Sequence, residues 1–128
     1  RNKIQSIINQ NLLRRKRLSF ENYALTMLKS KIVINTLSPL KLISPRYFES
    51  MASRAIVLCE ESSIYKKIIN EDFLITFKSN LENFDYKLQK AKELSNDSLF
   101  LDTMSVYVNA NHTWAKRIDS LKKSINQI

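Results

Sequence analysis

The sequence of 128 residues is 44% hydrophobic and carries 21 Lys and Arg residues against 12 Asp and Glu residues, a formal net charge of +9. This apolar content is enough for one hydrophobic core but thin for two, so residues 1–128 are expected to form a single domain. The charge predicts attraction to polyanions or to small anionic ligands such as diphosphates, while the absence of glycine excludes glycine-rich phosphate-binding loops.

Membrane insertion and cysteine chemistry are also constrained by the sequence. No apolar run approaches the roughly 20 residues that cross a bilayer, and no signal-peptide pattern precedes Asn2, so a cytoplasmic location is expected. Cys59 is the only cysteine, which excludes an internal disulfide and a cysteine metal cluster. It lies in an apolar run, where a small buried hydrophobic residue is expected.

The first predicted elements are two helices separated by a basic run. Apolar residues at helical spacing predict a helix over Lys3–Leu13, and the basic run Arg14, Arg15, Lys16 and Arg17 follows it. Ser19 is a suitable N-cap for a second helix that ends near Ser30. The apolar face of this second helix is expected to hold Phe20, Tyr23, Ala24, Met27 and Leu28.

Three nearly continuous apolar runs predict the buried strands of a parallel sheet, over Lys31–Leu37, Ala55–Cys59 and Phe73–Phe77. A helix is predicted to begin at Pro45, which suits a first helical turn, and a second over Ser62–Ile69. The first of these helices can face the sheet with Tyr47, Phe48, Met51 and Ala52. Strands that alternate with helices are typical of parallel crossovers.

The C-terminal third is predicted to be helical. Ser79 with Glu82 forms a capping-box pattern, and Leu81, Phe84, Leu88 and Ala91 follow at helical spacing. Asp97 is the expected cap of a helix that carries Leu101, Met104 and Val108. Thr113 is the expected cap of a last helix whose apolar stripe is Trp114, Ile118, Leu121 and Ile125, with Trp114 expected in the core. The predicted fold is therefore α/β, a Rossmann-like three-layer domain with a small parallel sheet of about three strands and a helical C-terminal third.

Ligands of open parallel sheets collect where loops leave the carboxyl ends of the strands, which directs attention to the loop from Ser38 to Arg46. The helix after this loop can hold a diphosphate with its free N–H groups, and Arg46 adds a charged donor. Glu49 lies about one turn further along and can accept both hydroxyls of a ribose. The alternative for Glu49 is a surface pair with Arg46. Tyr47 is expected to pack on the strands or to flank a base or sugar.

The stretch from Ser44 to Leu58, Ser-Pro-Arg-Tyr-Phe-Glu-Ser-Met-Ala-Ser-Arg-Ala-Ile-Val-Leu, resembles the signature of GT-B fold glycosyltransferases of the spore-maturation and related group 1 type. Upstream, Phe20-Glu-Asn-Tyr and Ser30-Lys-Ile-Val-Ile-Asn35 look like the helix and strand that lead into the family's donor site. Downstream, Asn111-His-Thr-Trp with Arg117 is similar to its closing helix motif.

The resemblance implies that this chain is the nucleotide-sugar-binding half of such an enzyme. Glu49 would contact the ribose, and Ser44, Pro45 and Arg46 would form the phosphate-contacting segment. The implied substrate is a nucleoside-diphosphate sugar, with no further cofactor. The N-terminal half that supplies acceptor contacts, and often the catalytic base, is expected to lie outside this sequence, so catalysis by this chain alone is not expected.

Two residues depart from the family's pattern. Arg54 stands in a turn where the family has glycine, and a left-handed turn costs Arg roughly 1 kcal/mol more than Gly. Lys41 stands where many retaining members have an acidic residue, so the usual sugar-hydroxyl contact and the retaining outcome are not expected to carry over.

The remaining candidates have structural and functional interpretations. His112 is the only histidine, and beside Thr113 it is either part of a helix cap or, with Arg117, an accessory residue of the site. No metal site is expected, because no second histidine or carboxylate cluster accompanies it.

The basic run from Arg14 to Arg17 is either a solvated helix end or a contact for anionic lipid. Nucleic acid is disfavoured, because the charges are spread along the chain and the aromatic residues occupy apolar positions. Two other functions stay open: a basic α/β module that binds nucleic acid or anionic membrane, and an inactive, truncated glycosyltransferase relative that serves as an interaction domain.

Overall fold

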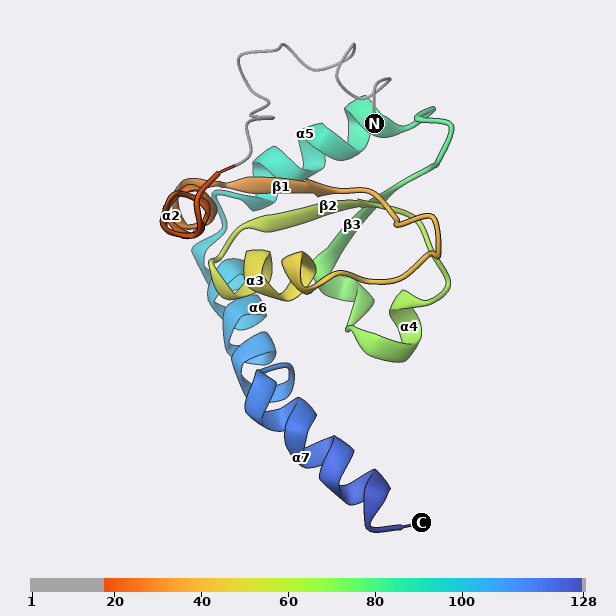
Figure 1. Ribbon diagram of the computed structural model, residues 1–128. Coiled ribbons are helices and arrows are strands. Elements are labelled where there is room, and N and C mark those ends of the chain that lie inside the picture. Colours follow the sequence, from red (N-terminus) through yellow and green to blue (C-terminus); the bar gives the residue numbers. More distant parts are fainter. Residues whose placement is uncertain (1–17, 128) are drawn as a thin grey trace.

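The computed structural model describes residues 18–127 of the chain (Figure 1). The elements in order are α2 (Phe20–Lys29), β1 (Ile32–Asn35), α3 (Pro45–Ala52), β2 (Ile56–Glu60), α4 (Tyr65–Ile68), the 3₁₀ turn η2 (Glu71–Phe73), β3 (Leu74–Phe77), α5 (Phe84–Leu94), α6 (Ser98–Asn111) and α7 (Trp114–Ile125). The helix predicted over Lys3–Leu13 and the basic run Arg14–Arg17 lie outside the described residues.

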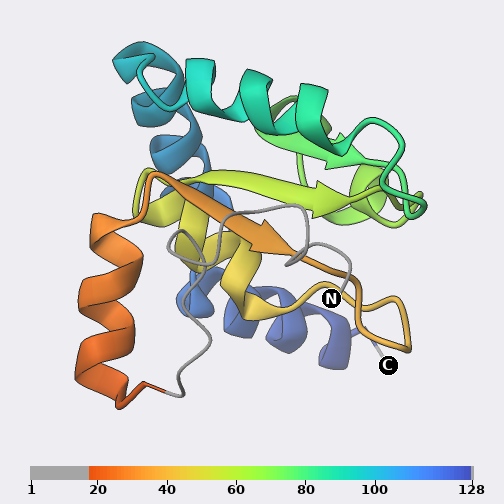
Figure 2. The ribbon, with the colours of Figure 1, turned by 90° about the horizontal axis from the view of Figure 1, so that it is seen from above.

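The three strands form one parallel sheet in the order β1-β2-β3, as the alternation of strands and helices predicted. The strands lie side by side in Figure 2, and Figure 1 shows α5 on one face of the sheet with α3 and α6 on the other. This arrangement of a small parallel sheet between helical layers confirms the predicted Rossmann-like α/β fold.

The core is centred on β2, because this strand has a neighbour on each side and helices on both faces. Ile56, Val57, Leu58 and Cys59 are all 0% exposed. Burial raises the pKa of the Cys59 thiol to about 12, so the thiolate needed for nucleophilic chemistry does not form near neutral pH. The interpretation of Cys59 as a small buried hydrophobic residue is confirmed.

Three of the predicted helix caps are confirmed. The side chain of Ser19 accepts a hydrogen bond from the Asn22 amide, Asp97 accepts one from Phe100, and Thr113 accepts one from Lys116. Each cap satisfies an N–H group that the first turn of a helix leaves without a partner. The starts of α2, α6 and α7 are therefore set by residues next to them in the sequence.

The predicted capping box at Ser79 and Glu82 is wrong. Helix α5 begins at Phe84 with Asn83 as its N-cap, because Leu81 adopts a positive φ of 65° that turns the chain before the helix. Glu82 instead accepts a hydrogen bond from Lys78 at 3.2 Å. The helix predicted over Ser62–Ile69 is also shorter than expected and spans only Tyr65–Ile68.

The apolar faces of the outer helices differ in how far they are buried. Leu101, Met104 and Val108 of α6 are buried as predicted. In contrast, of the face predicted for α2 only Met27 is buried, and Phe20 remains 86% exposed. The prediction that the α7 stripe is core is wrong, since Trp114, Ile118, Leu121 and Ile125 are exposed. Helix α7 leads away from the sheet in Figure 1, in agreement with the exposure of these residues.

Candidate functional site

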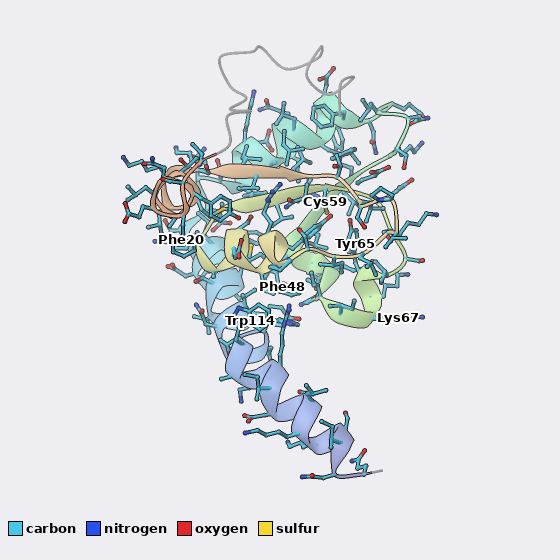
Figure 3. All side chains as sticks on the ribbon, viewed as in Figure 1. Phe20, Phe48, Cys59, Tyr65, Lys67 and Trp114 are labelled. Carbon is cyan, nitrogen blue, oxygen red and sulfur yellow. The ribbon has the colours of Figure 1, made fainter. Side chains whose placement is uncertain are left out.

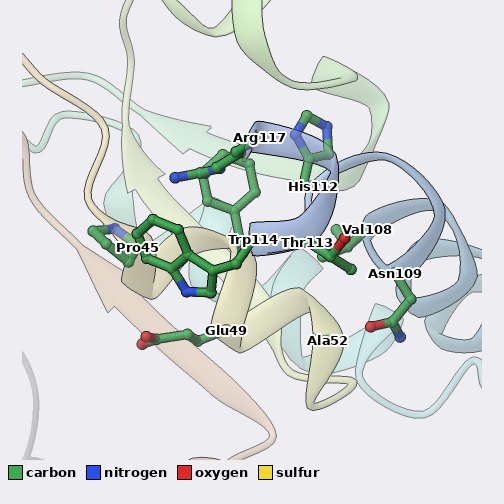
Figure 4. A pocket seen from close by; sticks show the side chains of 10 residues that line it. Pro45, Glu49, Ala52, Val108, Asn109, His112, Thr113, Trp114 and Arg117 are labelled. Atoms are coloured by element: carbon green, nitrogen blue, oxygen red, sulfur yellow. The ribbon is translucent and has the colours of Figure 1, made fainter. Parts of the chain in front are cut away.

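An open pocket of about 240 Å³ lies between α3 and the corner that joins α6 to α7 (Figure 4). Two segments that are far apart in the sequence form its walls. Pro45, Phe48, Glu49 and Ala52 come from α3, and Val108, Asn109, His112, Thr113, Trp114 and Arg117 come from the α6–α7 corner. Four residues proposed from the sequence, Pro45, Glu49, His112 and Arg117, therefore meet in one place.

Helix α3 is fixed to the rest of the fold by contacts below the pocket. The hydroxyl of Ser105 on α6 donates a hydrogen bond of 3.1 Å to the carbonyl oxygen of Ala52. The buried Ser50 hydroxyl bonds within α3, to the carbonyl oxygen of Arg46 at 2.6 Å, and lies 3.5 Å from the sulfur of Met27 on α2. Contacts with α6 and α2 thus support the pocket-facing residues of α3.

Tyr47 belongs to this support and not to the pocket wall. Its side chain is 1% exposed, and its hydroxyl lies 3.2 Å from the hydroxyl of Tyr65. Burial raises the pKa of Tyr47 above its ordinary value. Of the two interpretations of Tyr47, packing on the strands is the one that the structure shows, and a contact with a base or sugar does not fit its position.

The N-terminus of α3 has one backbone donor, the Arg46 amide, that bonds to no described residue. Ser44 is the N-cap residue, but its side chain makes no capping hydrogen bond. Pro45 has no N–H group, the Tyr47 amide bonds to the Ser44 carbonyl at 3.2 Å, and the Arg46 amide donates to no described residue. A helix start in this state can accept an anion, because the amides and the helix dipole both favour negative charge.

Glu49 presents its carboxylate at the edge of the pocket. The side chain is exposed, and its Oε2 atom accepts a hydrogen bond of 2.6 Å from the hydroxyl of Tyr23 on α2. Burial and then the Glu49 carboxylate raise the pKa of Tyr23. The alternative pairing of Glu49 with Arg46 is not found, since these two side chains form no ion pair.

Stacked rings from both walls and a guanidinium from α7 also line the pocket. The Phe48 and His112 rings stack with centroids 4.8 Å apart and an interplanar angle of 29°. The guanidinium carbon of Arg117 lies 4.5 Å from the Phe48 centroid and 5.4 Å from that of Trp114. Arg117 therefore contacts one aromatic residue on α3 and one on its own helix.

The surroundings of His112 favour the neutral form of its imidazole. Burial, and then the positive charge of Arg117, lower the pKa of this imidazole. Its Nε2 atom lies 3.0 Å from the Tyr107 hydroxyl, which also accepts a hydrogen bond from the Asn70 amide. His112 is the C-cap residue of α6 and not part of the cap at the start of α7, which Thr113 supplies, and it also lines the pocket.

Trp114 is a pocket residue that the sequence analysis assigned to the core. Its indole is 69% exposed and lines the pocket near Pro45 and Glu49 in Figure 4. Helical periodicity placed it in the core because it begins an apolar stripe. The Thr113 cap favoured exposure instead, because Trp114 follows it directly and a residue at the first position of a helix lies next to a turn of the chain.

The left-handed turn expected at Arg54 is present, with a φ of 61°. Its guanidinium binds the Asp102 carboxylate of α6 at 3.0 Å, with both side chains about half exposed. Lys41 also has a positive φ, of 53°, and does not line the pocket.

Two further properties hold for residues 18–127. None of the helices there is both long enough and apolar enough to cross a membrane. Within the same range, no three His, Cys, Asp or Glu side chains are grouped so that they could hold one metal ion.

The fold and the pocket define a Rossmann-like α/β domain with a small aromatic and charged site against the helix that follows its first strand. The sequence model of a family described as glycosyl transferase-like matches residues 3–123. The chain therefore belongs to this glycosyl transferase-like family, in agreement with the resemblance carried by Ser44–Leu58. No curated protein and no solved structure gives a significant match to the chain.

Proposed function

We propose that this chain is the donor-binding half of a GT-B fold glycosyltransferase of the spore-maturation type, and that it holds a nucleoside-diphosphate sugar in the pocket between α3 and α7. The observation that carries the proposal is the position of Glu49. Its exposed carboxylate lies about one turn beyond a helix start at which the Arg46 amide is free, and Glu49 lines the same pocket as Arg117 and Trp114. Membership of the glycosyl transferase-like family supports the class of reaction.

The ribose and the diphosphate are assigned to α3. Glu49 accepts the two ribose hydroxyls, because a carboxylate offers about four lone-pair sites and the Tyr23 hydroxyl occupies only one of them. Tyr23 also restricts the rotation of the carboxylate. The Arg46 amide and guanidinium bind the diphosphate at the helix start, next to Ser44 and Pro45.

The nucleobase is assigned to the Trp114 side of the pocket. An exposed indole offers a flat apolar face on which a base can stack. Arg117 has no carboxylate partner among the described residues. Its stacking on Phe48 restricts where the guanidinium can lie in the pocket. Arg117 is therefore placed to donate to phosphate or sugar oxygens, while neutral His112 supplies an uncharged wall.

Glycosyl transfer needs more than this half. The developing charge of the nucleoside-diphosphate leaving group is neutralised by Arg46 and the α3 amides, so the proposal invokes no metal. The acceptor and the catalytic base are assigned to an N-terminal Rossmann-like half outside this sequence.

Titration calorimetry with UDP, GDP and their sugars tests the proposal. The parent chain is expected to bind one nucleotide class, and Glu49→Ala to weaken binding about tenfold or more, because a hydrogen bond to a charged group contributes about 1.5–3 kcal/mol. Glu49→Gln keeps the size and one acceptor and is expected to fall between the two.

The matched control is Glu93→Ala, which removes an exposed glutamate from α5 on the other face of the sheet. This variant is expected to bind as the parent does. Absence of nucleotide binding by the parent, or equal losses in the Glu49 and Glu93 variants, would contradict the assignment of this pocket.

A further inference from the structure

The imidazole ring of His112 is held between α3 and the last turns of α6. Its ring centroid lies 4.8 Å from that of Phe48 on α3, and its Nε2 atom lies 3.0 Å from the hydroxyl of Tyr107 on α6. In Figure 3, Phe48 points from α3 toward the start of α7, where Trp114 lies. These contacts restrict both the position and the rotation of the imidazole.

The Tyr107 hydroxyl is itself fixed from another direction. It accepts a hydrogen bond of 2.9 Å from the backbone amide of Asn70, the N-cap residue of η2. A tyrosine hydroxyl has one hydrogen to donate, and the acceptor that lies within reach among the described residues is Nε2 of His112. All groups in this set of hydrogen bonds are paired only when Tyr107 donates to Nε2. Nε2 then carries no hydrogen.

The hydrogen of the neutral ring is therefore on Nδ1. A neutral imidazole carries one hydrogen, and the nitrogen that accepts a hydrogen bond does not hold it. The neutral form is favoured here, because burial and then the positive charge of Arg117 lower the pKa of His112. The Nδ1–H group donates to none of the described residues, although His112 lines the pocket. The pocket wall thus includes a neutral donor with no internal partner.

We infer that His112 donates from Nδ1 to a phosphate oxygen of the bound nucleoside diphosphate, and that Tyr107 is the positioning residue that keeps the hydrogen on this nitrogen. A phosphate oxygen is favoured as the acceptor, because Arg117 has no carboxylate partner among the described residues and attracts an anion. Figure 4 shows His112 and Arg117 at the same end of the pocket. The ligand in this inference rests on the proposed function, whereas the tautomer does not.

Nitrogen NMR of the imidazole tests the tautomer without any ligand. His112 is the only histidine, so the spectrum holds one pair of ring-nitrogen signals. Above neutral pH, Nδ1 is expected to have the shift of a protonated nitrogen and Nε2 that of an unprotonated one. Tyr107→Phe removes the donor to Nε2 and should move the hydrogen toward Nε2. The matched control Tyr86→Phe removes an exposed hydroxyl from α5 and should leave both signals unchanged.

Titration calorimetry with UDP and GDP tests the contact with the diphosphate. The side chain of Asn can place its amide NH₂ where Nδ1 lies, whereas Gln places it where Nε2 lies, and neither has a ring. His112→Gln should weaken binding about tenfold, as expected for a hydrogen bond to a charged acceptor, and His112→Asn should retain most of the affinity. Tyr107→Phe should cause a smaller loss, and Tyr86→Phe none. Circular dichroism and the thermal midpoint check that each variant keeps the fold.

The outcomes separate this inference from the proposed function. If the parent binds a nucleotide and His112→Gln binds it equally well, the proposed function stands and the His112 contact is wrong. Equal losses in His112→Asn and His112→Gln, or a hydrogen on Nε2 in the parent, would also overturn the inference. A loss in His112→Gln with nucleotide sugars but not with UDP or GDP would place the contact on the sugar instead. A parent that binds no nucleotide overturns the proposed function and the phosphate contact together, while the tautomer is measured without ligand.

Discussion

The guanidinium of Arg117 lies over the ring of Phe48, with its central carbon 4.5 Å from the ring centroid, and this contact joins α7 to α3 across the pocket. Because Phe48 is almost buried whereas Arg117 is partly exposed, the ring belongs to the core and the charge belongs to the pocket. One contact thus links the stability of the α6–α7 corner to the shape of the proposed donor site.

Replacement of Arg117 is expected to affect both properties. Arg117→Ala should lower the free energy of unfolding by about 0.5–1 kcal/mol, the usual size of a cation–π contact near a surface. It should also weaken nucleotide binding about tenfold, as expected for a charged donor to phosphate. Arg117→Lys keeps the charge but not the planar stack, so it should recover part of the affinity.

Urea denaturation and titration calorimetry measure these two effects. Lys123→Ala serves as the control, because it removes an exposed positive charge from the same helix. A loss of affinity in Lys123→Ala as large as that in Arg117→Ala would show that general charge, and not the placed guanidinium, attracts the nucleotide.

The left-handed conformation of Arg54 predicts a stabilising substitution. Arg54→Gly removes the penalty of a side chain at a φ of 61°, about 1 kcal/mol, and also removes the ion pair with Asp102. Exposed ion pairs contribute about 0.2–1 kcal/mol, so the net change in the free energy of unfolding should be small and stabilising.

The variant Asp102→Ala separates the two contributions to the Arg54 result, because it breaks the ion pair and leaves the turn as it is. It should destabilise by less than about 1 kcal/mol in urea denaturation. A net destabilisation in Arg54→Gly that exceeds the loss in Asp102→Ala would contradict the assignment of strain to this turn.

Local features of the sequence predicted the fold well. The strand runs were recognisable because strands covered on both faces are apolar throughout, as in β2. The caps Ser19, Asp97 and Thr113 act within three residues of their own positions, so no distant contact was needed to find them. Ser79 failed because a turn at Leu81 moved the start of α5 beyond it.

The pocket was predictable only in part. Pro45 and Glu49 follow from the position of one helix after one strand. The opposite wall depends on how α6 packs against α3, through contacts such as that between Ser105 and Ala52, which lie 53 residues apart. Periodicity showed that α7 has an apolar face but contains no information about what covers that face, which is why Trp114 was assigned to the core.

The lowered pKa of His112 predicts a pH dependence of stability. Burial and the charge of Arg117 hold this pKa below its ordinary value of 6.5 in the folded state. Such a group adds stability above its unfolded pKa, and this stability is lost as the pH falls through the folded pKa. The free energy of unfolding should therefore decrease between about pH 7 and about pH 5, and less steeply in His112→Gln. Identical pH profiles for the two proteins would show that carboxylates alone cause the decrease.

The exposed indole of Trp114 gives a direct signal for the proposed donor site, because it is the only tryptophan in the chain. If a nucleobase stacks on it, UDP or GDP should change the intrinsic fluorescence along a saturable curve, with a midpoint that matches the calorimetric dissociation constant. Trp114→Ala should weaken binding by about 1–3 kcal/mol, the usual effect of removing an aromatic platform for one base. Stability should change little, since the side chain is 69% exposed.

Tyr86→Ala removes a similarly exposed ring from α5 and should have no effect on binding. Nucleotide binding that leaves the fluorescence unchanged and is retained in Trp114→Ala would move the base away from this side of the pocket.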